Sequence, residues 1–70
     1  MDNIPETIGP MKQTWLCDII RKRFPTVKFS EVWEKTDKLT IPEYKHLLAL
    51  DYTDQVKFKE ALINQLSLQL

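Results

Sequence analysis

The segment from residue 11 to residue 24 constrains the fold of this chain more than any other. At about 100° per residue, Trp15 and Ile19 fall on one line along a helix. Leu16 and Ile20 fall on a second line beside the first. The apolar arc is therefore two strips wide, and a helix of this kind needs neighbours on two sides. It is either the central helix of a small bundle or a helix that keeps one strip for a partner.

Prolines and basic residues mark the ends of this first helix. Pro10 fits the first turn, because proline lacks the N–H group that would have no partner there. Pro25 disfavours the helical conformation at Phe24 and so ends the helix. Residues 21–23 are all basic, and cations complement the C-terminal end of a helix dipole. The sequence predicts a helix over about residues 11–24.

A second helix begins at a capping box. Thr40 and Glu43 have the spacing of an N-cap residue and its partner in the first turn. Leu39 and Tyr44 flank them at the positions of a hydrophobic staple. We predict a helix over about residues 41–50. Its buried face is expected to hold Ile41, Tyr44, Leu47 and Leu48.

The last helix carries a wide apolar face. Its main line is formed by Phe58, Leu62, Leu66 and Leu70. Val56 and Ile63 lie beside this line and widen the face that we expect to be buried. Asp51 or Thr53 is expected to cap the helix, which we predict over about residues 54–68.

The stretch from 26 to 36 carries two different signals. Val27 and Phe29 alternate with polar residues as in a short strand, whereas the apolar spacing from Phe29 onward is helical. Ser30 is a suitable N-cap. We predict a short helix over about residues 30–36, and the lead-in before it is compatible with either a strand or a helix.

Together these elements indicate an all-α protein. We predict a small bundle of three main helices plus the short one, because 70 residues allow one apolar core. Residues 11–70 would form the single helical domain. Residues 1–10 hold two prolines and the single glycine, so we expect an irregular arm pinned to the bundle by Ile4 and Ile8.

Several classes of chemistry lack the residues that they need. Cys17 is the single cysteine and His46 the single histidine, which excludes a structural zinc site. Cys17 is best explained as a small buried hydrophobic residue. The lone Gly9 excludes a glycine-rich phosphate loop. We expect no enzymatic activity, no metal and no cofactor.

The composition also restricts the environment and the partners. A lone cysteine and an N-terminus without a basic start and an apolar run predict a cytoplasmic protein. The longest apolar run covers residues 47–50, far short of the ~20 residues that cross a bilayer. Ten basic and ten acidic residues give a net charge of zero, which provides no general attraction to nucleic acid and does little to oppose self-association.

These features favour a small intracellular protein–protein interaction or adaptor protein that acts through an apolar helical face without catalysis. Its partner would be another protein or a second copy, as in a homodimer. Leu68 falls off the apolar face of its helix, so it is either frayed at the terminus or available to a partner. The candidate partner-binding residues are Trp15, Leu16, Ile19, Ile20 and Leu68.

The alternative is a small helix-turn-helix-like DNA-binding regulator. The helices at 30–36 and 41–50, with a four-residue turn between them, have the required layout. The nucleic-acid contacts would come from Arg21, Lys22, Arg23 and Lys28. The exposed face of the second helix offers Glu43, Lys45 and His46, without the Arg, Asn or Gln that usually read bases. Nucleic acid is therefore the less favoured partner.

Overall fold

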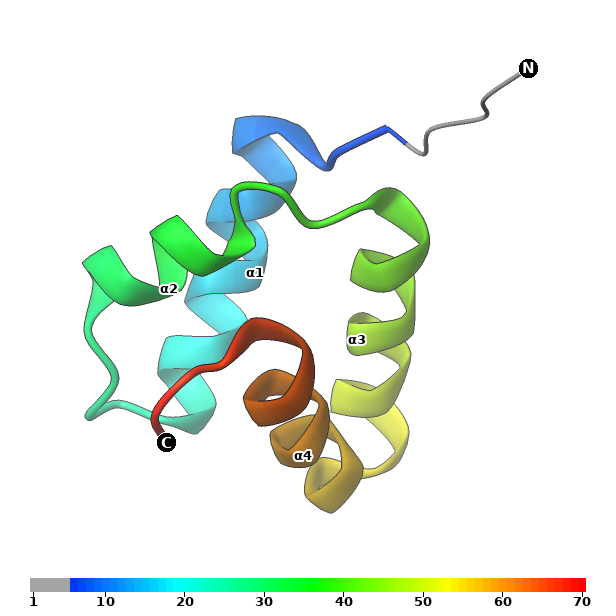
Figure 1. Ribbon diagram of the computed structural model, residues 1–70. Coiled ribbons are helices and arrows are strands. Elements are labelled where there is room, and N and C mark those ends of the chain that lie inside the picture. The colour runs from blue at the N-terminus through cyan, green and yellow to red at the C-terminus, as the bar shows by residue number, and fades with distance from the viewer. Residues whose placement is uncertain (1–5) are drawn as a thin grey trace.

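The chain folds into four helices in a computed structural model, which describes residues 6–70 (Figure 1). The helices are α1 (Gly9–Arg23), α2 (Phe29–Thr36), α3 (Ile41–Thr53) and α4 (Gln55–Leu66). The all-helical class is confirmed for the described residues. The helices pack mainly as two consecutive pairs, α1 with α2 and α3 with α4. The two pairs close around one hydrophobic core.

The ends of α1 follow the predicted signals. Gly9 has a φ of +76°, a conformation that glycine adopts readily, and Pro10 lies in the first turn. The last turn holds the three basic residues 21–23. Phe24 leaves the helix with φ −132° and ψ 76°, as expected for a residue before proline.

The burial of α1 differs from what its two apolar strips predict. Its buried residues form one strip and are Gln13, Leu16, Cys17 and Ile20. Trp15 is 54% exposed and Ile19 is half-buried, so the second strip lies largely at the surface. The prediction that the other helices cover both strips is therefore wrong for Trp15, whereas Ile19 packs against the core.

The helix α2 begins one residue before the predicted start. Lys28 occupies the N-cap position in an extended conformation, and its carbonyl accepts the first helical hydrogen bond from Val32 N–H at 3.1 Å. The predicted cap by Ser30 is wrong, because that residue already lies inside the first turn. Val27 is buried, which anchors the lead-in at this point.

The capping box at the start of α3 is confirmed. The Glu43 carboxylate accepts hydrogen bonds from the Thr40 N–H at 3.1 Å and from the Thr40 hydroxyl at 2.7 Å. The helix continues to Thr53, three residues beyond the predicted end. Asp54 then caps α4 by accepting from Lys57 N–H at 3.1 Å, in place of the predicted Asp51 or Thr53. One extended residue therefore both ends α3 and starts α4.

The apolar face of α4 is narrower than the sequence predicts. Its buried residues are Phe58, Ala61, Leu62 and Leu66. Val56 and Ile63 were expected beside them but are 70% and 42% exposed. Both line a surface hollow together with Arg23 and Phe24 at the end of α1, and the described residues leave them partly uncovered.

The C-terminal tail returns to the body of the molecule after α4. Ser67 has a left-handed φ of 55°, and its N–H donates to the Ile63 carbonyl at 3.1 Å. Leu68 is only 2% exposed, so the expectation that it is frayed or available to a partner is wrong. Gln69 N–H reaches the Glu31 carboxylate of α2 at 3.4 Å. The left-handed turn redirects the chain toward the side of the molecule that holds α1 and α2, as the red end of the ribbon shows (Figure 1).

The described part of the N-terminal arm is pinned by its backbone and by one side chain. Ile8 is buried, as predicted, and its N–H donates to the Leu39 carbonyl at 3.0 Å. The Glu6 carbonyl accepts from Ile41 N–H at 3.0 Å. The anchor expected at Ile4 lies outside the described residues. Within residues 6–70, the helices are too short or too polar to cross a membrane.

Candidate functional site

A broad surface hollow lies between the end of α1 and the outer flank of α4. Its volume is about 530 Å³, and two smaller hollows nearby measure about 340 and 270 Å³. It is lined by Arg23, Phe24, Gln55, Val56, Lys59, Glu60 and Ile63, and we call it the α1–α4 groove.

An aromatic residue forms the α1 side of the groove. Phe24 is half-buried, and its ring stacks on that of Phe58 with centroids 6.4 Å apart and an interplanar angle of 24°. Phe58 is fully buried in the core. The groove wall is therefore continuous with the packed interior, and its shape is fixed by the same contacts that hold the fold together.

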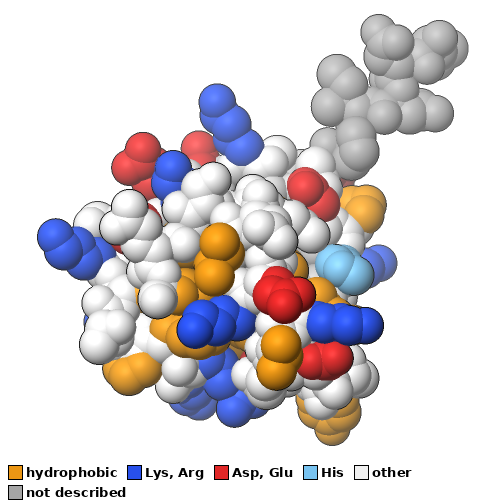
Figure 2. Space-filling view, turned by 60° about the horizontal axis from the view of Figure 1, so that its bottom comes forward, with side chains coloured by type: hydrophobic (Ala, Val, Ile, Leu, Met, Phe, Trp, Pro, Cys, Tyr) orange, Lys and Arg blue, Asp and Glu red, His pale blue; other side chains and the backbone are white. Residues whose placement is uncertain are grey.

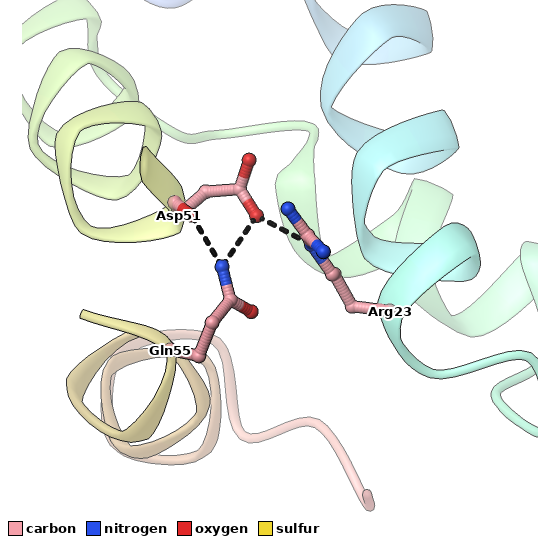
Figure 3. Close-up of polar contacts among 3 residues, drawn as sticks. All are labelled: Arg23, Asp51 and Gln55. Atoms are coloured by element: carbon pink, nitrogen blue, oxygen red, sulfur yellow. Dashed lines mark hydrogen bonds and ion pairs between the residues drawn. The ribbon is translucent and has the colours of Figure 1, made fainter. Parts of the chain in front are cut away.

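A polar cluster fixes one end of the groove (Figure 3). Arg23 Nε donates to the Asp51 carboxylate at 3.0 Å, which links α1 to α3. The side-chain amide of Gln55 donates to the same carboxylate at 3.2 Å and also to the Asp51 backbone carbonyl. Three helices therefore meet at one carboxylate. These contacts hold Arg23 and Gln55 at the rim.

The α4 side of the groove exposes apolar surface between charged residues. Val56 and Ile63 lie two turns apart, with Lys59 and Glu60 between them. Figure 2 brings forward the lower end of the molecule in Figure 1 and shows orange apolar side chains among separate blue and red ones. Covering the exposed parts of Val56 and Ile63 would contribute roughly 2 to 3 kcal/mol. The groove is thus suited to bind an apolar partner.

The structure separates the five partner-binding residues predicted from the sequence. Leu16 and Ile20 are fully buried and Leu68 is 2% exposed, so these three belong to the core. Trp15 is exposed, and Ile19 lines a hollow of about 270 Å³ with Lys22, Arg23 and Asp51. Of the five residues, only Ile19 lies near the α1–α4 groove, because Arg23 lines both the groove and the hollow that holds Ile19.

The basic residues predicted for nucleic acid are engaged in different contacts. The Arg21 guanidinium lies 5.6 Å from the centre of the Phe29 ring, which itself stacks on Trp33. Arg23 is paired with Asp51. Lys22 and Lys28 are exposed. The four residues therefore do not form one uninterrupted basic face.

The helix-turn-helix layout is present in the order of the elements but not in their packing. A turn at residues 37–40 joins α2 to α3. The main contacts of α2 are with α1, and those of α3 are with α4. The two helices lie on opposite sides of the view in Figure 1. This arrangement does not favour the DNA-binding alternative.

The residues that most often serve in catalysis or metal binding do not gather at the groove, whose lining, among the described residues, holds no His or Cys. Within residues 6–70, no three His, Cys, Asp or Glu side chains come close enough to hold a metal ion. His46 is exposed on α3. Cys17 is fully buried, as predicted, and this burial raises the pKa of its thiol above the ordinary 9.0. The groove itself offers apolar contact and charged rims.

Comparisons with protein-family models, with curated proteins and with solved structures find no match to this chain. Its function is therefore inferred from the geometry and chemistry of the groove.

Sequence reasoning missed most of the groove, although one signal pointed to it. Phe58, Leu62 and Leu66 are enough to fill one buried face of α4. Val56 and Ile63 are therefore surplus to that face, and their spacing of seven residues places them on one line of the helix. A surplus apolar line of this kind indicates that part of α4 stays exposed, as Val56 and Ile63 do.

Proposed function

We propose that this chain is a small intracellular protein-interaction or adaptor protein that binds its partner in the α1–α4 groove without catalysis. The observation that carries the proposal is the exposure of Val56 and Ile63 beside Phe24 in a hollow of about 530 Å³. An apolar patch with a polar rim is typical of interaction sites, and a groove between helices suits an amphipathic helix.

The groove is a better candidate than the other exposed apolar residues. Phe29 and Trp33 stack on each other with centroids 5.7 Å apart, and Arg21 covers part of that pair. Met11 and Trp15 are 66% and 54% exposed, but both lie on a single helix and do not line the groove. The groove, in contrast, combines apolar walls from two helices with a rim held by an ion pair.

Site-specific photocrosslinking in cells of the source organism tests this proposal. A benzophenone amino acid at Val56 is expected to form an adduct with another polypeptide chain, including a second copy. The matched control places the same group at Asn64, an exposed residue of α4 that does not line the groove. We expect the control to give no such adduct, and Ile63→Asp in the Val56-labelled chain to remove it.

The proposal fails if Val56 and Asn64 give the same adducts, or if neither gives any. Circular dichroism of each labelled chain establishes that it is folded, so that a missing adduct reports on binding.

A further inference from the structure

The exposed flank of α4 has a charge pattern that complements itself. Val56 and Ile63 are seven residues apart, so they lie within about 20° of one line along the helix. Lys59 and Glu60 fall on opposite sides of this line, each about 50° from its centre. All four residues line the α1–α4 groove. An apolar line is thus flanked by one cation and one anion at nearly the same height.

We propose that the partner in the groove is a second copy of this chain, with the two α4 helices side by side and parallel. The inference rests on the proposed function of the groove. A two-fold axis parallel to both helices brings Val56 onto Val56 and Ile63 onto Ile63. It also brings Lys59 of each copy opposite Glu60 of the other. Two ion pairs then flank an apolar seam, as in parallel helix pairs.

The opposite orientation is selected against by the same charges. In an antiparallel pair, the two-fold axis is perpendicular to both helices. The same flank of each helix then lies on the same side of the seam, so Lys59 faces Lys59 and Glu60 faces Glu60. Like charges at these positions repel. The charge pattern therefore specifies the parallel pair.

The groove wall adds a second complementary contact. Arg23 and Lys59 both line the groove, so two cations surround the position that Glu60 of a second copy would enter. The Arg23 side chain keeps half of its surface exposed while paired with Asp51. The net charge of zero leaves no overall repulsion between two copies.

Sedimentation equilibrium over a range of about 10 μM to about 1 mM tests the inference. The wild-type chain is expected to show a monomer–dimer equilibrium within this range. Lys59→Glu and Glu60→Lys should each raise the dissociation constant about tenfold, since each replaces two attractive pairs by two repulsive ones. The double swap, Lys59→Glu with Glu60→Lys, should restore the wild-type dissociation constant.

The matched control is Lys57→Glu, which makes the same change of net charge as Lys59→Glu at an exposed residue of α4 outside the groove. It should leave the dissociation constant unchanged. A monomer at every concentration overturns the inference, and so does a double swap that fails to restore dimerisation. If the chain stays monomeric while Val56 still crosslinks to a different protein, the groove remains a binding site and only the second copy is ruled out.

Discussion

Ser67 carries the conformational strain of the C-terminal turn. Among residues 6–70 it is the one residue other than glycine with a positive φ, at 55°. A left-handed conformation costs an L-residue roughly 1 kcal/mol, and glycine adopts it freely. Ser67→Gly is therefore expected to raise the free energy of unfolding by about 0.5 to 1 kcal/mol, measured by urea denaturation.

The matched control for this change is Ser30→Gly. Ser30 lies inside the first turn of α2 with right-handed helical geometry, where glycine weakens a helix. It should lower the free energy of unfolding by a few tenths of a kcal/mol. Equal effects of the two substitutions would show that the turn at Ser67 is not strained.

Cys17 makes stability depend on alkaline pH. Burial raises the pKa of its thiol above the ordinary 9.0, with a smaller opposing effect from the Thr36 hydroxyl at 3.8 Å. The unfolded thiol ionises first as pH rises, so the unfolded state binds fewer protons. The stability that the buried thiol contributes is fully present below about pH 9, and it is lost as the pH rises through the pKa of the thiol in the folded state.

The measurement is the free energy of unfolding at several pH values from 8 upward. Cys17→Ala should lower stability at neutral pH but flatten its decline above pH 9. Tyr44, whose pKa burial also raises, continues to contribute near and above its ordinary 10.0. A decline of unchanged slope in Cys17→Ala would assign the whole pH dependence to other groups.

The burial of single residues could be predicted only where a helix has a single apolar face that the other helices can cover. Cys17, Leu47 and Phe58 are buried as their positions on apolar lines indicate. Trp15 is not, because periodicity defines which residues share a strip but not which strip the other helices cover. That choice depends on how the pairs of helices pack.

The start of α3 depends on the hydrogen bonds of its capping box. The Thr40 hydroxyl and N–H both donate to the Glu43 carboxylate. Thr40→Ala is expected to lower the free energy of unfolding by about 1 kcal/mol, as for loss of an N-cap side chain. Thr14→Ala serves as the control, because the Thr14 hydroxyl bonds only to the Pro10 carbonyl on an exposed face.

The capping box also predicts a pH dependence in acid. The hydrogen bonds from Thr40 lower the pKa of Glu43 from its ordinary 4.5. The stability that this carboxylate provides is present above pH 4.5 and is lost as pH falls through the lower folded pKa. Thr40→Ala should make the decline of stability between about pH 5 and pH 3 shallower. An unchanged profile would show that these hydrogen bonds do not perturb Glu43.

The helices themselves were largely predictable, whereas their caps were less so. Periodicity located the bodies of all four, and the Thr40–Glu43 pair located one start to the residue. The caps at Lys28 and Asp54 were missed, because several polar residues near each start are suitable. Lys28 and Asp54 are the residues with the extended conformation that an N-cap needs, which the sequence does not display.

At the scale of the whole molecule, the all-helical class followed from the sequence but the groove did not. The groove needs Phe24 from the end of α1 and Val56 from the start of α4, which are 32 residues apart in the chain. No local pattern specifies that these two ends meet. The packing of Phe24 on Phe58 brings them together.

The C-terminal tail ties the last helix back to the first pair of helices. Leu68 is 2% exposed in the core, and Gln69 N–H bonds to Glu31 on α2. Leu68→Ala should therefore lower the free energy of unfolding by about 2 to 4 kcal/mol, as for a buried leucine. Gln69→Ala, which keeps the backbone N–H, should change it by less than about 0.5 kcal/mol. Equal and small effects of both substitutions would mean that the tail is not part of the core. A large loss confined to Leu68→Ala would establish that the Leu68 side chain is part of the core, and this side chain would then not be available to a partner.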